Sequence, residues 1–310
     1  MRPHGAFRLL LVSSALTGAN WIPLAGAPVD RPDVNGLIAQ VGERLAVYYQ
    51  RAQRLICLER STVMPISTDW SAQGFARTVE SELRVEIDEA DGDALPDPRV
   101  SRTVQRVNGR EPRDRDLTDR SGCTDPTPVS PEPLAFLLPG RRDEYTFTAV
   151  RDGRERDRAA LLIDFATSPA ARRAGRPELV EDELGHDDCF DWKGPVAITG
   201  RLWVDARTHD VLRLERHIAG PTDLRVPGPL QRKYRFPTWL TIDRDDLTMR
   251  YKEVVFSDPH EVMLLPESIE SVTVLRSALQ SIRRTQVFSD YRRFLTGSRI
   301  IKGGIESQSR

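Results

Sequence analysis

The sequence predicts a mostly β protein of the α+β class, in which a broad, curved antiparallel sheet of about ten strands packs against one long N-terminal helix. Two periodicities carry this prediction. Between Asp33 and about Leu58 the apolar residues recur with the spacing of one helical face. From residue 75 onward they alternate with polar residues, which is typical of half-buried strands. No strand–helix–strand rhythm follows, which argues against a parallel α/β sheet.

The expected helix begins at Asp33, whose carboxylate can accept the first free backbone N–H groups, while Pro32 discourages an earlier start. Its apolar stripe consists of Val34, Leu37, Ile38, Val41, Leu45, Tyr48, Tyr49, Ala52, Leu55 and Ile56. At ~1.5 Å per residue a helix ending near Leu58 is roughly 35–40 Å long. An apolar stripe of that length needs an equally long partner, and the sheet is the natural one.

Residues 1–27 have the pattern of a cleaved secretory signal peptide. Arg2 and Arg8 give a positive start, Leu9–Leu24 is mostly apolar, and Ala25–Ala27 forms an A-x-A cleavage site. The apolar run is too short and interrupted for a stable membrane span, and Ala27 stands where a lipoprotein signal has cysteine. We expect a periplasmic or extracellular mature chain that does not span the membrane. An uncleaved anchor is the alternative.

The charge pattern gives little support to nucleic-acid binding. The chain carries 45 basic and 46 acidic residues, and no basic block interleaves with aromatic residues. Residues 28–296 are expected to form one domain, and residues 297–310 a polar C-terminal tail.

Three cysteines remain in a chain expected to be exported. Cys123 and Cys189 lie in polar, loop-like sequence and are the expected disulfide pair. Closing that loop of about 66 residues would contribute about 4 kcal/mol. Cys57, beside apolar residues at the end of the expected helix, is interpreted as a buried reduced thiol. A nucleophilic role for Cys57 would need a histidine partner.

Ten strands are expected, at residues 78–87, 100–107, 145–150, 159–165, 196–205, 210–218, 238–243, 248–256, 267–276 and 283–294. Turns are expected at Asn108-Gly109, Asp152-Gly153, Ala206–His209 and Arg244–Asp246. His209 stands where such a turn favours glycine, so a positive φ is expected there. A short helix is expected to open at Ser130-Pro131-Glu132, with Ser130 as N-cap, to run through Leu134–Leu138 and to end at Pro139-Gly140. Residues 168–186 and 219–236 are expected to be loops.

No catalytic or metal-binding signature stands out. The His186–Cys189 cluster lacks the second spaced pair of a zinc site, and His260-Glu261 lacks a histidine at position 264. We therefore expect no metal and no cofactor.

Asp205, His209 and Asp210 resemble an acid–base trio. Turn chemistry explains aspartate at these positions equally well, and an exposed hairpin tip gives no shelter from water.

Four segments resemble a group of secreted bacterial proteins. They are Ser130–Pro139, Gly200–Asp205 with Val211–Arg213, Leu265–Ile269 and Phe288–Phe294. At the level of architecture that group is similar to the periplasmic lipoprotein-carrier (LolA-like) superfamily. The resemblance implies an open antiparallel half-barrel whose concave face is covered by helices, with space for an apolar ligand such as an acyl chain. It assigns no carrier ligand residue to a position in this chain.

Three interpretations of function follow. The first is an exported, non-enzymatic protein that binds or carries a lipid or lipoprotein-like ligand between helix and sheet. The second is an interaction or envelope-sensor module with a filled core that binds another protein. The third is a hydrolase in which His186, His209, His217 or His260 meets a nucleophile. For the first, the expected ligand-lining residues are Val41, Leu45, Tyr48, Tyr49, Leu83, Val85, Leu212 and Leu214.

Overall fold

The long N-terminal helix and the strand that follows it set the arrangement of the molecule. Helix α1 (Val34–Ala52) leads directly into β1 (Leu55–Ile66), which lies inside a large antiparallel sheet. The computed structural model describes residues 33–52, 55–67, 69–87, 98–113, 132–173, 175–181, 190–257, 260–276, 281–295 and 299–304. The expected signal peptide and the pair Cys123 and Cys189 lie outside these ranges.

The other strands are β2 (Arg77–Ile87), β3 (Pro98–Val107), β4 (Tyr145–Glu155), β5 (Arg158–Thr167), β6 (Glu178–Glu181), β7 (Phe190–Lys193), β8 (Ile198–Asp205), β9 (Val211–Ile218), β10 (Thr222–Arg225), β11 (Trp239–Ser257), β12 (His260–Arg276), β13 (Ser281–Leu295) and β14 (Arg299–Gly304). The helices are η1 (Glu132–Leu137, a 3₁₀ helix), α3 (Pro139–Arg142), α4 (Pro169–Arg172) and α5 (Gly228–Tyr234).

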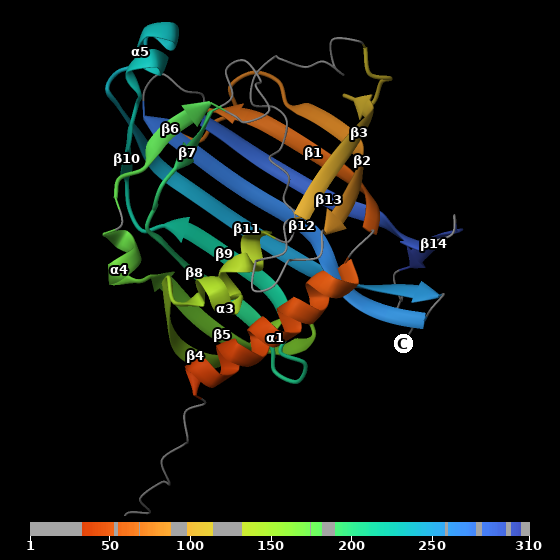
Figure 1. Ribbon diagram of the computed structural model, residues 1–310. Coiled ribbons are helices and arrows are strands. Elements are labelled where there is room, and N and C mark those ends of the chain that lie inside the picture. The colour runs from red at the N-terminus through yellow and green to blue at the C-terminus, as the bar shows by residue number, and fades with distance from the viewer. Residues whose placement is uncertain are drawn as a thin grey trace, which may run out of the picture. The chain divides into compact units, whose positions relative to one another are not determined.

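The strands form one open sheet in the order β3-β2-β1-β13-β12-β11-β9-β8-β5-β4. Strands β6, β7, β10 and β14 join it at the side, which gives 14 described strands rather than about ten. Figure 1 shows the sheet curving, with α1, η1 and α3 against its concave face. The predicted fold class, mostly β with an open antiparallel sheet, is therefore confirmed. We call the face that meets α1 the inner face.

The predicted C-terminal end of the first helix is wrong. The helix ends at Ala52, and the apolar run Leu55–Leu58 opens β1 between β2 and β13. A run of four apolar residues fits both a helical face and a buried strand, so the spacing alone could not separate them. The N-terminal end is as expected, because Asp33 Oδ1 accepts the N–H of Asn35 at 3.1 Å.

The expected hairpin about Arg244–Asp246 is also wrong, because β11 is one continuous strand of 19 residues. A register shift against β12 between Ile242 and Arg244 absorbs the irregularity. The neighbouring strand β9 supplies partners for the charges: Arg216 bonds Asp245 at 3.1 Å, and His217 Nδ1 lies 2.9 Å from Asp246. These ion pairs let the charged triplet remain in the sheet.

Several expected loops contain regular structure. The turn predicted at Asp152-Gly153 lies instead at residues 156–157, where Arg156 takes a φ of 52° and lets β4 and β5 extend further. The stretch 168–186 contains α4 and β6, and the stretch 219–236 contains β10 and α5. Residues 299–304 of the expected tail form β14, which pairs with β11 and β13. Short elements at a sheet margin carry too few residues to show a period.

The helix predicted at Leu134–Leu138 is the 3₁₀ helix η1, and Pro139 begins α3 rather than ending a helix. Proline suits the first position of a helix, because its missing N–H needs no partner there.

Two turns agree closely with the predictions from the sequence. Asn108 and Gly109 have φ values of 49° and 75°, as a two-residue primed turn requires, and Val107 and Arg110 exchange two backbone hydrogen bonds across it. The turn between β8 and β9 places His209 at a φ of 62°, so that prediction is confirmed.

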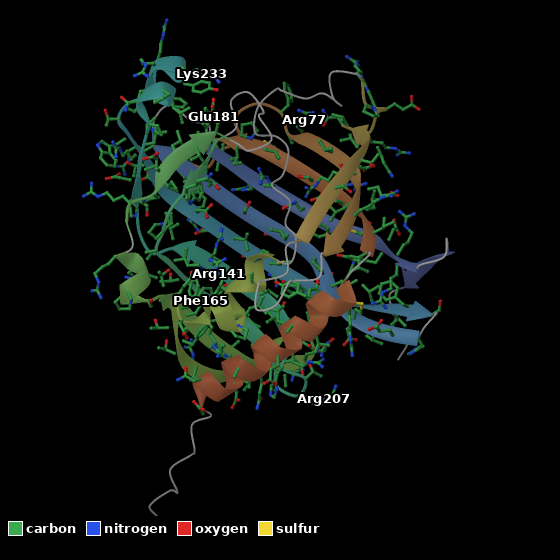
Figure 2. The ribbon with its side chains drawn as sticks, viewed as in Figure 1. Arg77, Arg141, Phe165, Glu181, Arg207 and Lys233 are labelled. Atoms are coloured by element: carbon green, nitrogen blue, oxygen red, sulfur yellow. The ribbon has the colours of Figure 1, made fainter. Side chains whose placement is uncertain are left out.

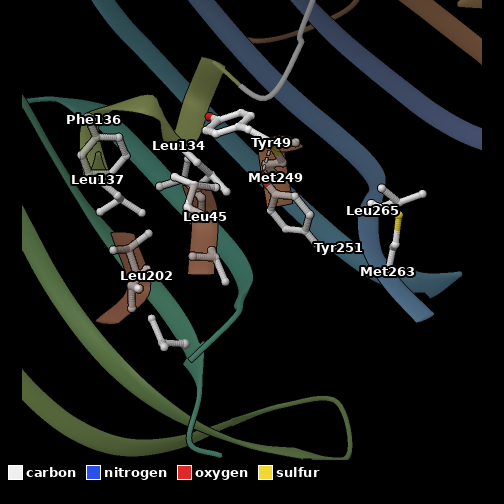
Figure 3. Packing of buried hydrophobic residues seen from close by; sticks show 14 of the residues in the cluster. Leu45, Tyr49, Leu134, Phe136, Leu137, Leu202, Met249, Tyr251, Met263 and Leu265 are labelled. Atoms are coloured by element: carbon white, nitrogen blue, oxygen red, sulfur yellow. Dashed lines mark hydrogen bonds between the residues drawn. The ribbon is translucent and has the colours of Figure 1, made fainter. Parts of the chain in front are cut away.

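The main core lies between α1, η1 and the inner face (Figure 3). Helix α1 buries Leu37, Ile38, Val41, Leu45 and Tyr49, and the sheet side includes Leu202, Leu214, Met249 and Leu265, all 0 % exposed. Gly42 lets η1 approach closely, because a Cβ there would lie 2.8 Å from the carbonyl oxygen of Leu137. A second, smaller core packs β6, β10 and α5 against the beginning of β11.

We predict that Leu45→Ala lowers the free energy of unfolding by about 2–5 kcal/mol, because Leu45 is buried in the main core and its truncation leaves a cavity. Urea unfolding measures the change. Glu43→Ala, on the exposed side of the same helix, is the control, with an expected change within about 0.5 kcal/mol. A loss well under about 1 kcal/mol for Leu45→Ala would contradict a buried α1.

Candidate functional site

A small hollow opens where α1 meets the β8–β9 hairpin. Its volume is about 30 Å³, and we call it the α1 pocket. Val41, Leu45, Leu134, Val211, Tyr251 and Leu264 form its apolar wall, and Arg44, Tyr48, His209 and Asp210 complete its lining. The helix, η1, the hairpin, β11 and β12 therefore all contribute to it. A hollow of this size holds a water molecule or two but no acyl chain.

An ion pair joins the two sides of the pocket. Both atoms Nε and Nη2 of Arg44 on α1 lie 3.2 Å from the Asp210 carboxylate in the hairpin. The Arg44 side chain is 44 % exposed, so water screens this pair and its net contribution is small. A second pair, Arg51 with Glu261 at 3.6 Å, ties the other end of α1 to β12.

The aromatic groups of the pocket remain protonated. Loss of water on burial raises the pKa of Tyr48 and of Tyr251 well above 10. The Tyr251 hydroxyl lies 3.2 Å from the Met249 sulfur, and the Tyr48 and Tyr49 rings meet edge to face at 5.7 Å. The pocket is apolar inside with a polar rim.

The expected ligand-lining residues separate into three groups. Val41, Leu45 and Tyr48 line the α1 pocket. Tyr49, Leu83 and Leu214 lie in the same core but not in the pocket wall. Leu212 packs instead with Ala160 and Trp203, because a register shift after Trp203 turns it away from Leu214. The side chain of Val85 lies outside the described part of the structure.

Asp205, His209 and Asp210, which resemble an acid–base trio in the sequence, form part of the turn between β8 and β9. Asp205 Oδ1 accepts the backbone N–H groups of Arg207 and Thr208 at 2.9 and 2.8 Å, and its other oxygen accepts from Arg158. Burial acts to raise the pKa of Asp205, but the hydrogen bonds from Thr208, Arg207 and Arg158 together outweigh it and hold this pKa below its usual value. Asp205 therefore closes the hairpin and balances an arginine, and neither role needs catalysis.

Cys57 is a buried free thiol in β1 rather than at a helix end. Burial first, and the nearby Glu59 second, raise the pKa of Cys57 to about 12. A protonated thiol is a poor nucleophile, which disfavours a catalytic role for it. Within the described ranges no three histidine, cysteine or acidic side chains come together as metal ligands. The His186–Cys189 cluster lies outside those ranges.

Beyond α1 the inner face becomes polar, which the sequence did not indicate. Glu59 is 1 % exposed, and it pairs with Arg102 Nε at 2.5 Å and with Gln286 Nε2 at 2.7 Å. Further along, Asp245 accepts from Arg216 and from the Thr273 hydroxyl. We call these six residues the polar strip. If the sequence had been interpreted as a strand here, the alternation of side chains would have placed Glu59 on the same face as Cys57.

The comparisons with known proteins give structural neighbours but no sequence relatives. Neither a family model nor a curated protein matches this sequence. One solved structure, described as an outer membrane lipoprotein-sorting protein domain from Vibrio parahaemolyticus, is 11% identical with a TM-score of 0.31. That match covers 84% of this chain and 95% of the other.

A second solved structure, a LolA superfamily protein from Nitrosomonas europaea, is 9% identical with a TM-score of 0.27, covering 83% of this chain and 92% of that one. The first description names lipoprotein sorting and the second names the LolA superfamily. At these identities and scores the likeness says nothing about a ligand. In the part of the chain that is described, no helix combines the length and the apolar character needed to cross a membrane.

We predict that the protein loses stability at alkaline pH. Between pH 9 and about 12 the Cys57 thiol ionises in the unfolded chain but stays protonated when folded. The folded state then binds more protons, so the free energy of unfolding falls by about 1.4 kcal/mol per pH unit from this group. The buried tyrosines Tyr251 and Tyr291, whose pKa values are raised by burial, add to the loss above pH 10.

Urea unfolding at pH 8 and pH 10.5 measures this effect, and Cys57→Ala should show a smaller decrease than the wild type. Thiol counting gives an independent check, because the native wild type and native Cys57→Ala should react equally at pH 8. One additional fast-reacting thiol in the wild type would show that Cys57 is accessible, contrary to this account.

Proposed function

We propose that this chain is an exported, non-enzymatic protein of the cell envelope that binds an apolar or acylated ligand between α1 and the inner face of the sheet. The observation that carries the proposal is the α1 pocket, which has an apolar wall and a charged rim at this interface. The signal-like pattern of residues 1–27 supports export to the periplasm.

The size of the pocket sets how such a ligand could bind. A volume of about 30 Å³ is an order of magnitude below that of an ordinary small-molecule site. A ligand with an acyl chain therefore needs α1 to move away from the sheet. The helix adds no hydrogen bond to the sheet ladder, so it can move without breaking strand pairing.

The free energy lost when α1 leaves the sheet and the free energy gained when an acyl chain is buried in its place are similar in size. Exposing the five buried apolar side chains of α1 costs about 8–15 kcal/mol at ~1.5–3 kcal/mol each. A twelve-carbon chain gains about 10 kcal/mol at ~0.8 kcal/mol for each buried CH₂. An acyl chain can thus take the place of α1 on the inner face, and the free protein stays closed.

The polar strip limits where the chain of the ligand lies. Glu59 and Arg102 form a charged pair beyond the end of the apolar core, and apolar carbon gains nothing beside them. The acyl chain should therefore lie along the strip of inner face that α1 covers, with its polar end at the rim near Arg44 and Asp210.

The second candidate is a protein-interaction or envelope-sensor module on the same fold. Dense packing favours it, because Ile38, Leu137, Leu202, Leu214 and Leu265 are all 0 % exposed. Close packing around a small hollow is what a core without a ligand requires.

Native mass spectrometry of the mature chain, residues 28–310, separates the two candidates. The chain is exported in a bacterial host and purified without detergent. Adducts that release fatty acid or phospholipid on denaturation support an apolar ligand. A bare polypeptide mass, unchanged after incubation with lipid, would contradict it and favour the filled-core module.

We predict that Arg51→Ala strengthens binding of dansylaminoundecanoic acid, a fluorescent fatty acid, by about two- to fivefold. The change removes the exposed ion pair to Glu261, worth up to ~1 kcal/mol, that helps to hold α1 closed, and Arg51 does not line the pocket where the ligand binds. Fluorescence titration measures the dissociation constant. Arg60→Ala is the matched control, since it removes a similarly exposed pair, Arg60 with Glu80 at 2.7 Å, on β1 and β2. Equal strengthening in both variants, or none in Arg51→Ala, would argue against α1 as the moving part.

A further inference from the structure

The loop between β1 and β2 presents a fully exposed aromatic side chain. Phe75 is 95 % exposed, and Trp70 in the same loop is 39 % exposed. A Phe side chain left in water gives up the free energy of burying its ring, so such exposure is unusual. Among the described residues, three of the five large apolar side chains with high exposure, Trp70, Phe75 and Trp239, lie at this end of the sheet.

Hydrogen bonds hold the β1–β2 loop in its conformation. The Asp69 carboxylate accepts the Ser67 hydroxyl and, at 2.8 Å, the Ser71 hydroxyl. The backbone N–H of Gln73 bonds the carbonyl oxygen of Pro65 at 2.8 Å, which ties the loop back to β1. Gly74 follows with a φ of 90°, a conformation that glycine readily adopts, and it turns the chain so that Phe75 points outward.

The loop lies far from the α1 pocket. Strand β1 runs the 12 residues from the end of α1 to this loop, which is roughly 35 Å at ~3.3 Å per residue. Figure 2 shows Arg77, the first residue of β2, at the end of the sheet away from α1. Phe75 is therefore not part of the pocket.

The surroundings of the loop are basic. Arg77 follows the loop directly. The turn after β3 lies alongside, because Asn108 bonds Thr78 through both its backbone and its side chain. This turn carries Arg106, Arg110 and Arg113. Asp69 and Glu111 are the acidic residues of the same two segments. The Arg244 guanidinium, which also pairs with Asp246, lies 4.1 Å from the centre of the Trp70 ring.

We propose that the β1–β2 loop, with the arginine-bearing turn after β3, docks the protein on an anionic lipid surface, where Phe75 inserts among the acyl chains. Aromatic side chains with arginines around them suit the membrane–water interface, where the ring meets apolar carbon and the guanidinium meets phosphate. A stable protein interface needs about 800 Å² on each partner, much more than one projecting side chain supplies. The inference is independent of a ligand under α1.

Vesicle flotation tests the proposal with the full-length mature protein. The probes are vesicles of phosphatidylethanolamine and phosphatidylglycerol in a 7:3 ratio, with phosphatidylcholine vesicles for comparison. The wild type should float with the anionic vesicles and at least fivefold less with phosphatidylcholine. Phe75→Ser should reduce binding to the anionic vesicles at least tenfold, and Arg106→Glu with Arg110→Glu should reduce it further and remove its salt dependence.

Val287→Ser is the matched control, because Val287 is an exposed apolar residue on β13, 43 % exposed and away from the loop. Its binding should equal that of the wild type. Circular dichroism checks that each variant is folded. Flotation of Phe75→Ser at the wild-type level would overturn the proposal. It would also be overturned if the wild type floated with neither kind of vesicle and Phe75 were instead protected by a protein partner.

Discussion

The inner face of the sheet has to be kept from water, and α1 does this with a single apolar stripe. Every strand from β1 to β8 in the sheet order contributes a side chain to the core that α1 and η1 cover. Side-chain packing, the ion pairs of Arg44 and Arg51, and a hydrogen bond from Arg293 to the backbone carbonyl of Arg51 hold α1 in place. None of these contacts is a backbone bond of the strand pairing. The function proposed above requires a second state in which α1 has moved off the inner face.

The sequence predicted the parts of this fold that have a regular period and missed those set by neighbours. The 3.6-residue stripe of α1 and the β8–β9 hairpin emerged from pattern alone, including the positive φ of His209. The continuity of β11 did not, because its charged triplet resembles a turn until Arg216 and His217 of the adjacent strand supply partners. Pairing between distant strands decides such cases, and a single sequence does not show it.

In the candidate site, too, the residues with a regular period were predicted and those set by neighbouring strands were missed. Val41, Leu45 and Tyr48 were predicted to face the sheet and do line the α1 pocket, since their helical spacing places them on one side. The polar strip was missed because Glu59 belongs to a strand that the sequence suggested was helix. Leu212 was misplaced because a register shift moves it to another cluster. The exposure of Phe75 has no sequence signal at all, since an aromatic residue next to a strand is usually buried.

Hydrogen exchange of the backbone amides of α1 tests the central claim, that α1 is a cover able to open independently of the sheet. The comparison is with the amides of β8 and β11, which lie beneath it. The account predicts that the α1 amides exchange through a local opening, well before those of the two strands, and that a bound fatty acid changes exchange in α1 more than in the sheet. Exchange of α1 and the strands at one common rate, set by global unfolding, would show that the helix is a fixed part of the core.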